Sequence, residues 1–165
     1  MTERSDRYGD QALRLRDPRR FGAALWEKGD ADAHPLIAPL GIEPLSEAFT
    51  GEWLHGATRG RSTAIKLFLM DSHAIVGIGN IYASESLFRA GVDPRTPTGR
   101  LSRKRCKRIV TAIKATLDAA LEAGGSTLRD FLHSDGSSGW FQQQHFVYGR
   151  EGEPCRVCGA RVRAL

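Results

Sequence analysis

Residues Gly77–Phe88 read GIGNIYASESLF, and this stretch decides the fold. Its glycines predict a tight turn, and the apolar spacing that follows predicts a helix over residues 81–89, which Gly91 terminates. Glycine lets a phosphate approach the backbone closely, and a helix N-terminus offers free amides and partial positive charge. The turn is therefore a candidate anion site with Asn80 as an added donor; the alternative is an ordinary glycine turn. Glu85 is expected to be a buried, hydrogen-bonded structural carboxylate.

Further helices are predicted on both sides of this one. Pro44–His55 is a helix candidate with Ser46 as its N-cap, and Thr63–Met70 is a shorter one. The clearest helix runs from Ser102 to Ala123. Its apolar stripe consists of Ile109, Ala112, Ile113, Leu117, Ala120 and Leu121. Its other face carries Arg103, Lys104, Lys107, Arg108 and Lys114, which form either a solvated surface or a source of long-range attraction to a polyanion.

The two ends of the chain are expected to be extended rather than helical. Residues 1–10 are polar and are expected to be frayed. Short strands are predicted at Ala12–Arg16 and Phe21–Trp26, followed by a linker over Glu27–Glu43 that is rich in proline and glycine. After a short helix at Leu128–Leu132, Trp140–Gly149 and Pro154–Leu165 are expected to be extended or hairpin segments.

Composition and charge narrow the class of protein. With 41% hydrophobic and 26% charged residues in a chain of 165, the sequence can bury a core in one domain or two small ones. A net charge of +5 favours a polyanionic partner such as nucleic acid, without proving one. No apolar run reaches membrane-span length, and the polar start lacks an apolar signal core, so the protein is expected in the cytoplasm. Three cysteines, an odd number, argue against a disulfide scaffold.

Two polar, glycine-containing segments are candidate nucleic-acid contacts. In Asp17–Gly22, two arginines stand beside an aromatic residue on a turn, where they can reach bases while the ring wedges into a duplex. The alternative is a turn with Phe21 in the core and solvated arginines. Ser134–Gly139 is a flexible loop that can close over an extruded base, and Tyr148 and Arg150 can contact the backbone beside it. The alternative is a surface loop followed by an edge strand.

Cys155 and Cys158, followed by Gly159, form the first half of a zinc knuckle. Structural zinc takes four ligands, and no second pair of cysteines or histidines follows in this sequence. The pair therefore indicates ancestry more strongly than bound metal.

Taken in order, these segments resemble the formamidopyrimidine-DNA glycosylase family, which belongs to the same superfamily as endonuclease VIII. The resemblance covers nearly the whole chain from Ala12 onward. It implies a mainly α fold: a helix-two-turns-helix DNA-binding domain, preceded by remnant strands of an N-terminal β-sandwich lobe and followed by a truncated zinc-finger hairpin. The implied divisions are residues 1–28 for the lobe remnant, 29–43 for the linker, 44–139 for the DNA-binding domain and 140–165 for the hairpin.

The resemblance also implies residue roles. Arg19, Arg20 and Phe21 match the loop that fills the gap left by a flipped nucleotide. Lys66, Asn80 and Tyr148 match phosphate contacts. The loop that covers a damaged purine is matched by Ser134, Asp135, Gly136, Ser137, Ser138 and Gly139. Cys155 and Cys158 match the first two ligands of the family's single structural zinc ion.

The implied activity is base-excision repair of oxidised purines, including 8-oxoguanine and formamidopyrimidines, by a combined glycosylase and abasic-site lyase. The partner is damaged or abasic duplex DNA in the bacterial nucleoid, and the protein is expected to be a monomer. The family's proline nucleophile, the glutamate beside it and a lobe lysine have no match here, and neither do the last two zinc ligands. The chain is therefore expected to keep damaged-DNA binding but to be inactive alone. The alternatives are a non-catalytic damaged-DNA-binding module and a non-functional gene fragment.

Overall fold

The computed structural model describes residues 3–8, 11–16, 24–123 and 145–164, and the chain divides into two compact units, Met1–Ala38 and Pro39–Leu165. In the first unit, β1 (Glu3–Tyr8) pairs antiparallel with β2 (Gln11–Arg16), with Glu3 opposite Arg16 and Tyr8 opposite Gln11. The expectation that residues 1–10 are frayed was wrong for residues 3–8, because these residues pair with β2 as a strand. A short 3-10 helix, η1 (Ala31–Ala33), follows.

The first unit contains no strand at residues 24–26, where the end of a second strand was expected. That the strands belong to a β-sandwich lobe stays a prediction, as does the division of the chain at residues 28, 43 and 139.

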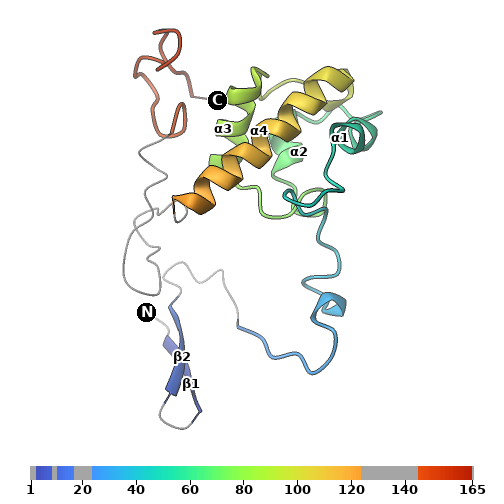
Figure 1. Ribbon diagram of the computed structural model, residues 1–165, viewed down its shortest axis with the longest axis vertical. Helices are drawn as coiled ribbons and strands as arrows, with labels where there is room; N and C mark the ends of the chain where they lie inside the picture. Colours follow the sequence, from blue (N-terminus) through green and yellow to red (C-terminus); the bar gives the residue numbers. More distant parts are fainter. Residues whose placement is uncertain (1–2, 9–10, 17–23, 124–144, 165) are drawn as a thin grey trace. The chain divides into compact units, whose positions relative to one another are not determined.

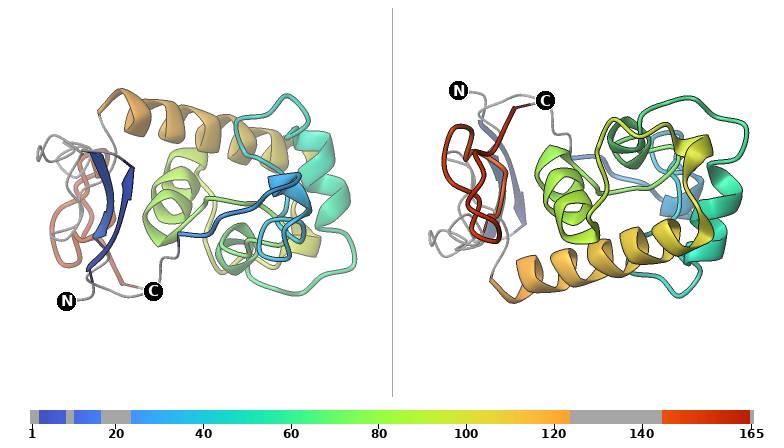
Figure 2. Two further views of the ribbon diagram at one scale, coloured as in Figure 1. Left: turned by 90° about the horizontal axis from the view of Figure 1, so that it is seen from below. Right: turned by 90° about the horizontal axis from the view of Figure 1, so that it is seen from above.

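The second unit is helical. Its elements are α1 (Gly51–Ala57), α2 (Ile65–Leu69), α3 (Asn80–Ala90), η2 (Thr98–Arg100) and α4 (Arg103–Glu122). The long helix α4 packs against both α3 and α1, and α2 lies against α3 (Figure 1). Figure 2 shows α4 running along one side of this unit, with α3 and α1 at different points along its length. The mainly helical fold expected from the sequence is confirmed.

Helix α4 forms where its pattern predicts, and its cap explains where it starts. The Ser102 hydroxyl accepts a hydrogen bond from the Arg105 amide at 3.3 Å, which satisfies a first-turn donor. Ile109 and Ile113 are fully buried, as the apolar stripe predicts. Leu121 was expected in the same stripe, but it is 67% exposed. At 3.6 residues per turn, Leu121 projects about 120° away from Ile109, so it falls outside the face that packs.

The expected start of the first helix was wrong. Helix α1 begins at Gly51, and the Thr50 hydroxyl, not that of Ser46, caps it by accepting from the Trp53 amide at 3.1 Å. Ser46 instead donates its hydroxyl to the Glu43 carbonyl at 2.7 Å within a turn. Such local bonds to the backbone compete with helix formation, which is why a serine is an ambiguous start signal.

The core lies between these helices. Its fully buried side chains include Phe49, Leu54, Ile65, Leu69, Ile75, Leu87, Leu101, Ile109 and Ile113. Arg59 joins the end of α1 to the segment before α4, because its guanidinium donates to the carbonyls of Gly99 and Leu101 at 2.9 and 2.8 Å. None of the described helices is both long and apolar enough to cross a membrane.

Candidate nucleic-acid interface

The N-terminus of α3 is built for an approaching anion. The chain turns at Gly77, whose φ of 78° favours glycine, and enters the helix through Gly79 without a side-chain cap. Asn80 is the first helical residue and is exposed, and its carbonyl accepts from the Ser84 hydroxyl at 2.8 Å. The expected helix and its termination at Gly91, where φ is 61°, are confirmed. An uncapped helix start with an exposed amide side chain can donate several hydrogen bonds to one phosphate.

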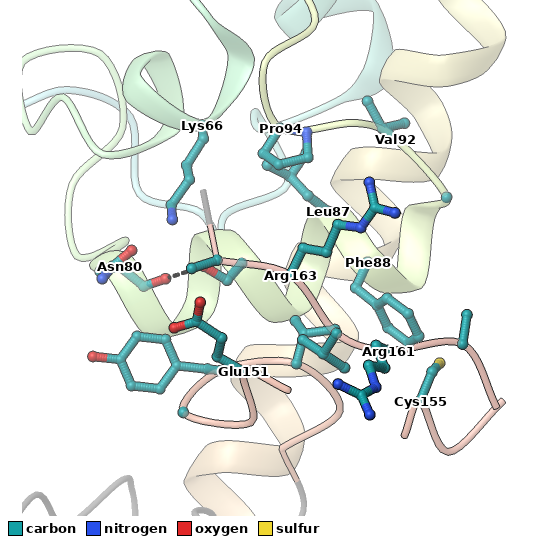
Figure 3. Close-up of a pocket in the computed structure, with 18 of the residues that line it drawn as sticks. Lys66, Asn80, Leu87, Phe88, Val92, Pro94, Glu151, Cys155, Arg161 and Arg163 are labelled. Carbon is teal, nitrogen blue, oxygen red and sulfur yellow. Dashed lines mark hydrogen bonds between the residues drawn. The ribbon is translucent and has the colours of Figure 1, made fainter. Parts of the chain in front are cut away.

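A pocket of about 650 Å³ opens beside this helix start, and we call it the clamp pocket. Its walls come from α3, from Lys66 on α2 and from the C-terminal segment. Lys66, Asn80 and Tyr148 all line it, so the structure brings together the three phosphate contacts expected in the described residues. Figure 3 shows the Lys66 side chain pointing toward the Asn80 end of α3. The pocket therefore combines a cation, an amide and a phenol around one helix N-terminus.

Two further cations and one carboxylate in the clamp pocket were missed from the sequence. Arg161 and Arg163 line it from the C-terminal segment, and Glu151 lines it as well (Figure 3). The alternation of Arg161 and Arg163 places both on one side of an extended chain, which is a signal the sequence contains. Three cations against one acid leave the lining positively charged, which suits a phosphate.

Glu85 holds the C-terminal segment against α3. The side chain is completely buried, as expected. One carboxylate oxygen accepts from the Phe146 amide at 2.9 Å, and the other accepts from the amides of Val147 and Tyr148 at 2.9 and 2.8 Å. Charge-assisted bonds to three successive amides fix the backbone of this turn. Glu85 thereby determines where Tyr148 stands relative to Asn80.

Arg150, which the sequence offers as a candidate contact to the DNA backbone, makes hydrogen bonds within the C-terminal segment. Its guanidinium donates to the Phe146 carbonyl at 2.8 Å, to the Pro154 carbonyl at 2.9 Å and to Glu153 Oε2 at 2.8 Å. All three nitrogens are therefore engaged within the segment. The described part of Trp140–Gly149 also forms turns rather than an extended strand.

Aromatic contacts complete the junction between α3 and this turn. The Phe88 and Phe146 rings stack with centroids 5.6 Å apart, and the Arg89 guanidinium lies 5.5 Å from the centre of the Phe146 ring. The His145 ring meets the Tyr148 ring edge-on at 5.6 Å. Burial lowers the pKa of His145, so the neutral ring is favoured beside the clamp pocket.

Cys155 and Cys158 lie at a tight loop. The Val157 amide donates to Cys155 Sγ at 3.4 Å, the Gly159 amide donates to the Cys155 carbonyl at 2.9 Å, and Gly159 has a φ of 72°. The hydrogen bond from the Val157 amide lowers the pKa of the Cys155 thiol, which favours the thiolate that metals bind. The bridge between Pro154 and Arg161 closes the loop.

These two thiols are of the ligand type that structural zinc takes, and they supply two of its four ligands. Among the residues that the structure describes, no group of three or more histidine, cysteine or acidic side chains gathers around a common point. The other half of a four-ligand set is therefore not provided by the described residues, and no step is assigned to a metal.

The three cysteines are expected to differ in reactivity. Cys106 is fully buried and burial raises the pKa of its thiol, whereas Cys158 is exposed. Brief iodoacetamide treatment at neutral pH, read by peptide mass spectrometry, should alkylate Cys158 and leave Cys106 unmodified until denaturant is added. Alkylation of Cys106 in the folded protein would contradict its position in the core.

Two sets of expected site residues, Arg19, Arg20 and Phe21 and the loop Ser134–Gly139, lie outside the described residues. Their roles stay predictions.

An uncapped helix start beside a cationic pocket, carried by a mainly helical core, is an arrangement that nucleic-acid-binding domains use to hold a phosphate. Comparison with known families agrees: residues 40–132 match the model described as the formamidopyrimidine-DNA glycosylase H2TH domain. The chain belongs to the formamidopyrimidine-DNA glycosylase family.

Relatives support this assignment along most of the chain. Proteins named formamidopyrimidine-DNA glycosylase from Aromatoleum aromaticum and Cupriavidus pinatubonensis are 60% and 58% identical over 96% and 93% of this chain. The chain covers 58% and 55% of those proteins, so it spans less than two thirds of their length.

Solved structures agree with the fold. The MutM (Fpg) protein of Thermus thermophilus superimposes with a TM-score of 0.86 at 40% identity, over 96% of this chain and 61% of that one. A complex of Lactococcus lactis Fpg with DNA containing an abasic site gives a TM-score of 0.83 at 30% identity, over 98% of this chain and 59% of that one.

Proposed function

We propose that this chain is the DNA-gripping part of a base-excision-repair glycosylase and that it binds duplex DNA at oxidised purines or abasic sites. The observation that carries the proposal is the convergence of Lys66, Asn80 and Tyr148 on one pocket at the N-terminus of α3. Further support comes from relatives: Lactococcus lactis Fpg has been solved with DNA containing an abasic site and with DNA containing Fapy-dG. The cellular setting we infer is the bacterial nucleoid, with the protein as a monomer.

The clamp pocket suits a backbone phosphate for three physical reasons. Lys66 contributes a full positive charge, which releases counterions from DNA on binding. The start of α3 contributes amides and the positive end of the helix dipole, and Asn80 contributes a neutral donor. Tyr148 also lines the pocket, and its backbone amide is held by Glu85. Such contacts hold the duplex in register but carry no base preference, so we assign the preference for a damaged site to Arg19, Arg20 and Phe21 and to the loop Ser134–Gly139.

The chemistry of base removal is not assigned to any residue described here. In the family, an N-terminal amine attacks the sugar and forms a Schiff base, and elimination then cuts the strand. We propose that the described residues contribute binding and positioning to that course. The structural zinc ion, the abasic-site lyase step and the preference for 8-oxoguanine are likewise proposed from the resemblance to the family.

Binding should be measured by gel shift with a duplex carrying an abasic-site analogue and with the intact duplex, at several salt concentrations. The chain should prefer the abasic duplex. Lys66→Ala should weaken binding roughly tenfold and lower the salt slope by about 0.9, because one phosphate contact is lost. Arg100→Ala removes an exposed cation outside the pocket and serves as the matched control. Equal affinity for both duplexes would refute lesion recognition.

The second candidate function is a non-catalytic damaged-DNA-binding module, favoured by the phosphate-binding groups Lys66, Asn80 and Tyr148 that the described residues bring to the clamp pocket. Borohydride trapping on an 8-oxoguanine duplex tests whether this polypeptide takes part in the chemistry. No covalent adduct is expected of a chain that only binds, whereas an adduct would rule out the non-catalytic module and show that the polypeptide supplies the amine nucleophile itself.

A further inference from the structure

A second cationic surface lies between α3 and α4, and we call it the α3–α4 groove. It has a volume of about 520 Å³ and is lined by Arg89 and Ala90 of α3 and by Lys104, Lys107, Arg108, Thr111, Ala112 and Ala115 of α4. The three basic residues on α4 are exposed. Within the described part of the chain, these three make no ion pair or hydrogen bond through their side chains. The groove is therefore a concentration of uncompensated positive charge.

The α3–α4 groove is separate from the clamp pocket. The two sites share no lining residue, although they adjoin along α3: Phe88 and Gly91 line the clamp pocket, whereas Arg89 and Ala90 line the groove. A ligand of the groove therefore contacts a different set of side chains from a ligand of the clamp pocket.

The lining of the groove selects the chemistry of its partner. Cations stand along its edges, while Ala90 and Ala112 form a buried apolar floor between the helices. A floor of small apolar side chains receives an apolar side chain, which a phosphate backbone does not carry. From Lys104 to Ala115 the α4 side extends about 16 Å, the length of about five extended residues.

We infer that the α3–α4 groove docks a short acidic peptide segment of a partner protein, with carboxylates on Lys104, Lys107 and Arg108 and one apolar side chain on the alanine floor. Charge complementarity and the apolar floor carry this inference, and neither depends on the proposed DNA function. Arg89 contributes a charge whose position is fixed, because its guanidinium contacts the Phe146 ring and donates to the Thr116 hydroxyl at 3.2 Å.

The test uses the full chain and a fluorescent peptide in which aspartates flank a central leucine, with binding followed by anisotropy at about 0.15 M salt. Saturable binding is expected, and a peptide with serine in place of leucine should bind more weakly because the floor is left unfilled. The double variant Lys104→Glu/Lys107→Glu should lose roughly tenfold or more in peptide affinity through charge reversal. The matched control, Arg100→Glu/Arg103→Glu, makes the same change in net charge outside the groove.

Three outcomes would overturn the inference. The first is no saturable peptide binding, and the second is equal loss in the groove variant and the control. The third is that intact duplex DNA competes for the peptide and itself depends on Lys104 and Lys107, which would make the groove a second DNA surface. Circular dichroism and thermal melting confirm that each variant is folded. The peptide experiment and the abasic-duplex gel shift are measured separately. A failure to bind the peptide therefore leaves the proposed DNA-binding function standing, and a failure to bind the abasic duplex leaves the peptide-docking inference standing.

Discussion

Glu85→Ala is expected to destabilise the attachment of the C-terminal segment by about 3–5 kcal/mol, because it removes three charge-assisted hydrogen bonds and leaves three backbone donors without their acceptor. The loss should appear as faster amide hydrogen exchange at Phe146, Val147 and Tyr148. Urea unfolding should show a lower midpoint or a separate early transition. Binding to the abasic duplex should fall with it, because Tyr148 loses its fixed position.

Two further variants make the Glu85 result specific. Glu85→Gln keeps the shape but turns one oxygen into a donor, so it should cause an intermediate loss. Glu122→Ala removes an exposed carboxylate at the end of α4 and should change the free energy of unfolding by about 0.5 kcal/mol or less. A Glu85→Ala protein with unchanged exchange at Phe146–Tyr148 would contradict the anchoring role.

Gly41→Ala is expected to cost about 3 kcal/mol or more of global stability. An added Cβ would lie 2.2 Å from the Ala74 carbonyl carbon and 2.7 Å from the His73 carbonyl oxygen. Both are backbone atoms, so neither can swing aside. The clash would push apart two segments that are joined by backbone hydrogen bonds. The Gly41 amide donates to the Ser72 carbonyl at 2.8 Å, and the Ile42 amide donates to the Ala74 carbonyl at 3.1 Å. Ile75, which is fully buried, would be pushed out of the core with them.

The control for Gly41→Ala is Gly56→Ala. Gly56 is a helical residue of α1, and an added Cβ there meets no atom within 4 Å. Alanine should raise stability at this position by about 0.5–1 kcal/mol, because glycine has more backbone entropy to lose. Opposite signs for the two variants in thermal unfolding are the expected result. A tolerated Gly41→Ala would show that the Gly41 and Ala74 segments are not tightly packed.

Strong local signals allowed the sequence to predict α3 and α4. Ser102 caps α4 and Gly91 ends α3, and each signal acts on neighbouring residues only. The start of α1 was misplaced because Ser46 and Thr50 are both plausible caps, and the choice depends on tertiary packing: an added Cβ at Gly51 would lie 2.7 Å from the Lys107 Cα. That close approach joins residues more than fifty positions apart, which no local pattern reveals.

The candidate site shows the same limit. Lys66, Asn80 and Tyr148 were predicted by resemblance, but their meeting in one pocket depends on contacts between distant segments. Arg150 was a candidate contact to the DNA backbone because it follows the Ser134–Gly139 loop, and the fold shows three internal acceptors for its guanidinium that the sequence does not reveal. The charged side chains can be identified from the sequence, but which of them are already engaged in internal contacts depends on the fold.

The three bonds at Glu85 also bear on the order in which the molecule assembles. They connect residues 61 to 63 positions apart, whereas most contacts within a helix join close neighbours. Closing so long a loop has a large entropic cost that is recovered only when the contacts form, so such contacts tend to form late. The clamp pocket is lined by α3 at one end of this long chain separation and by the segment around Tyr148 at the other end. During synthesis, the helices can therefore form before the pocket exists, and the emerging chain acquires its grip only after Tyr148 has left the ribosome.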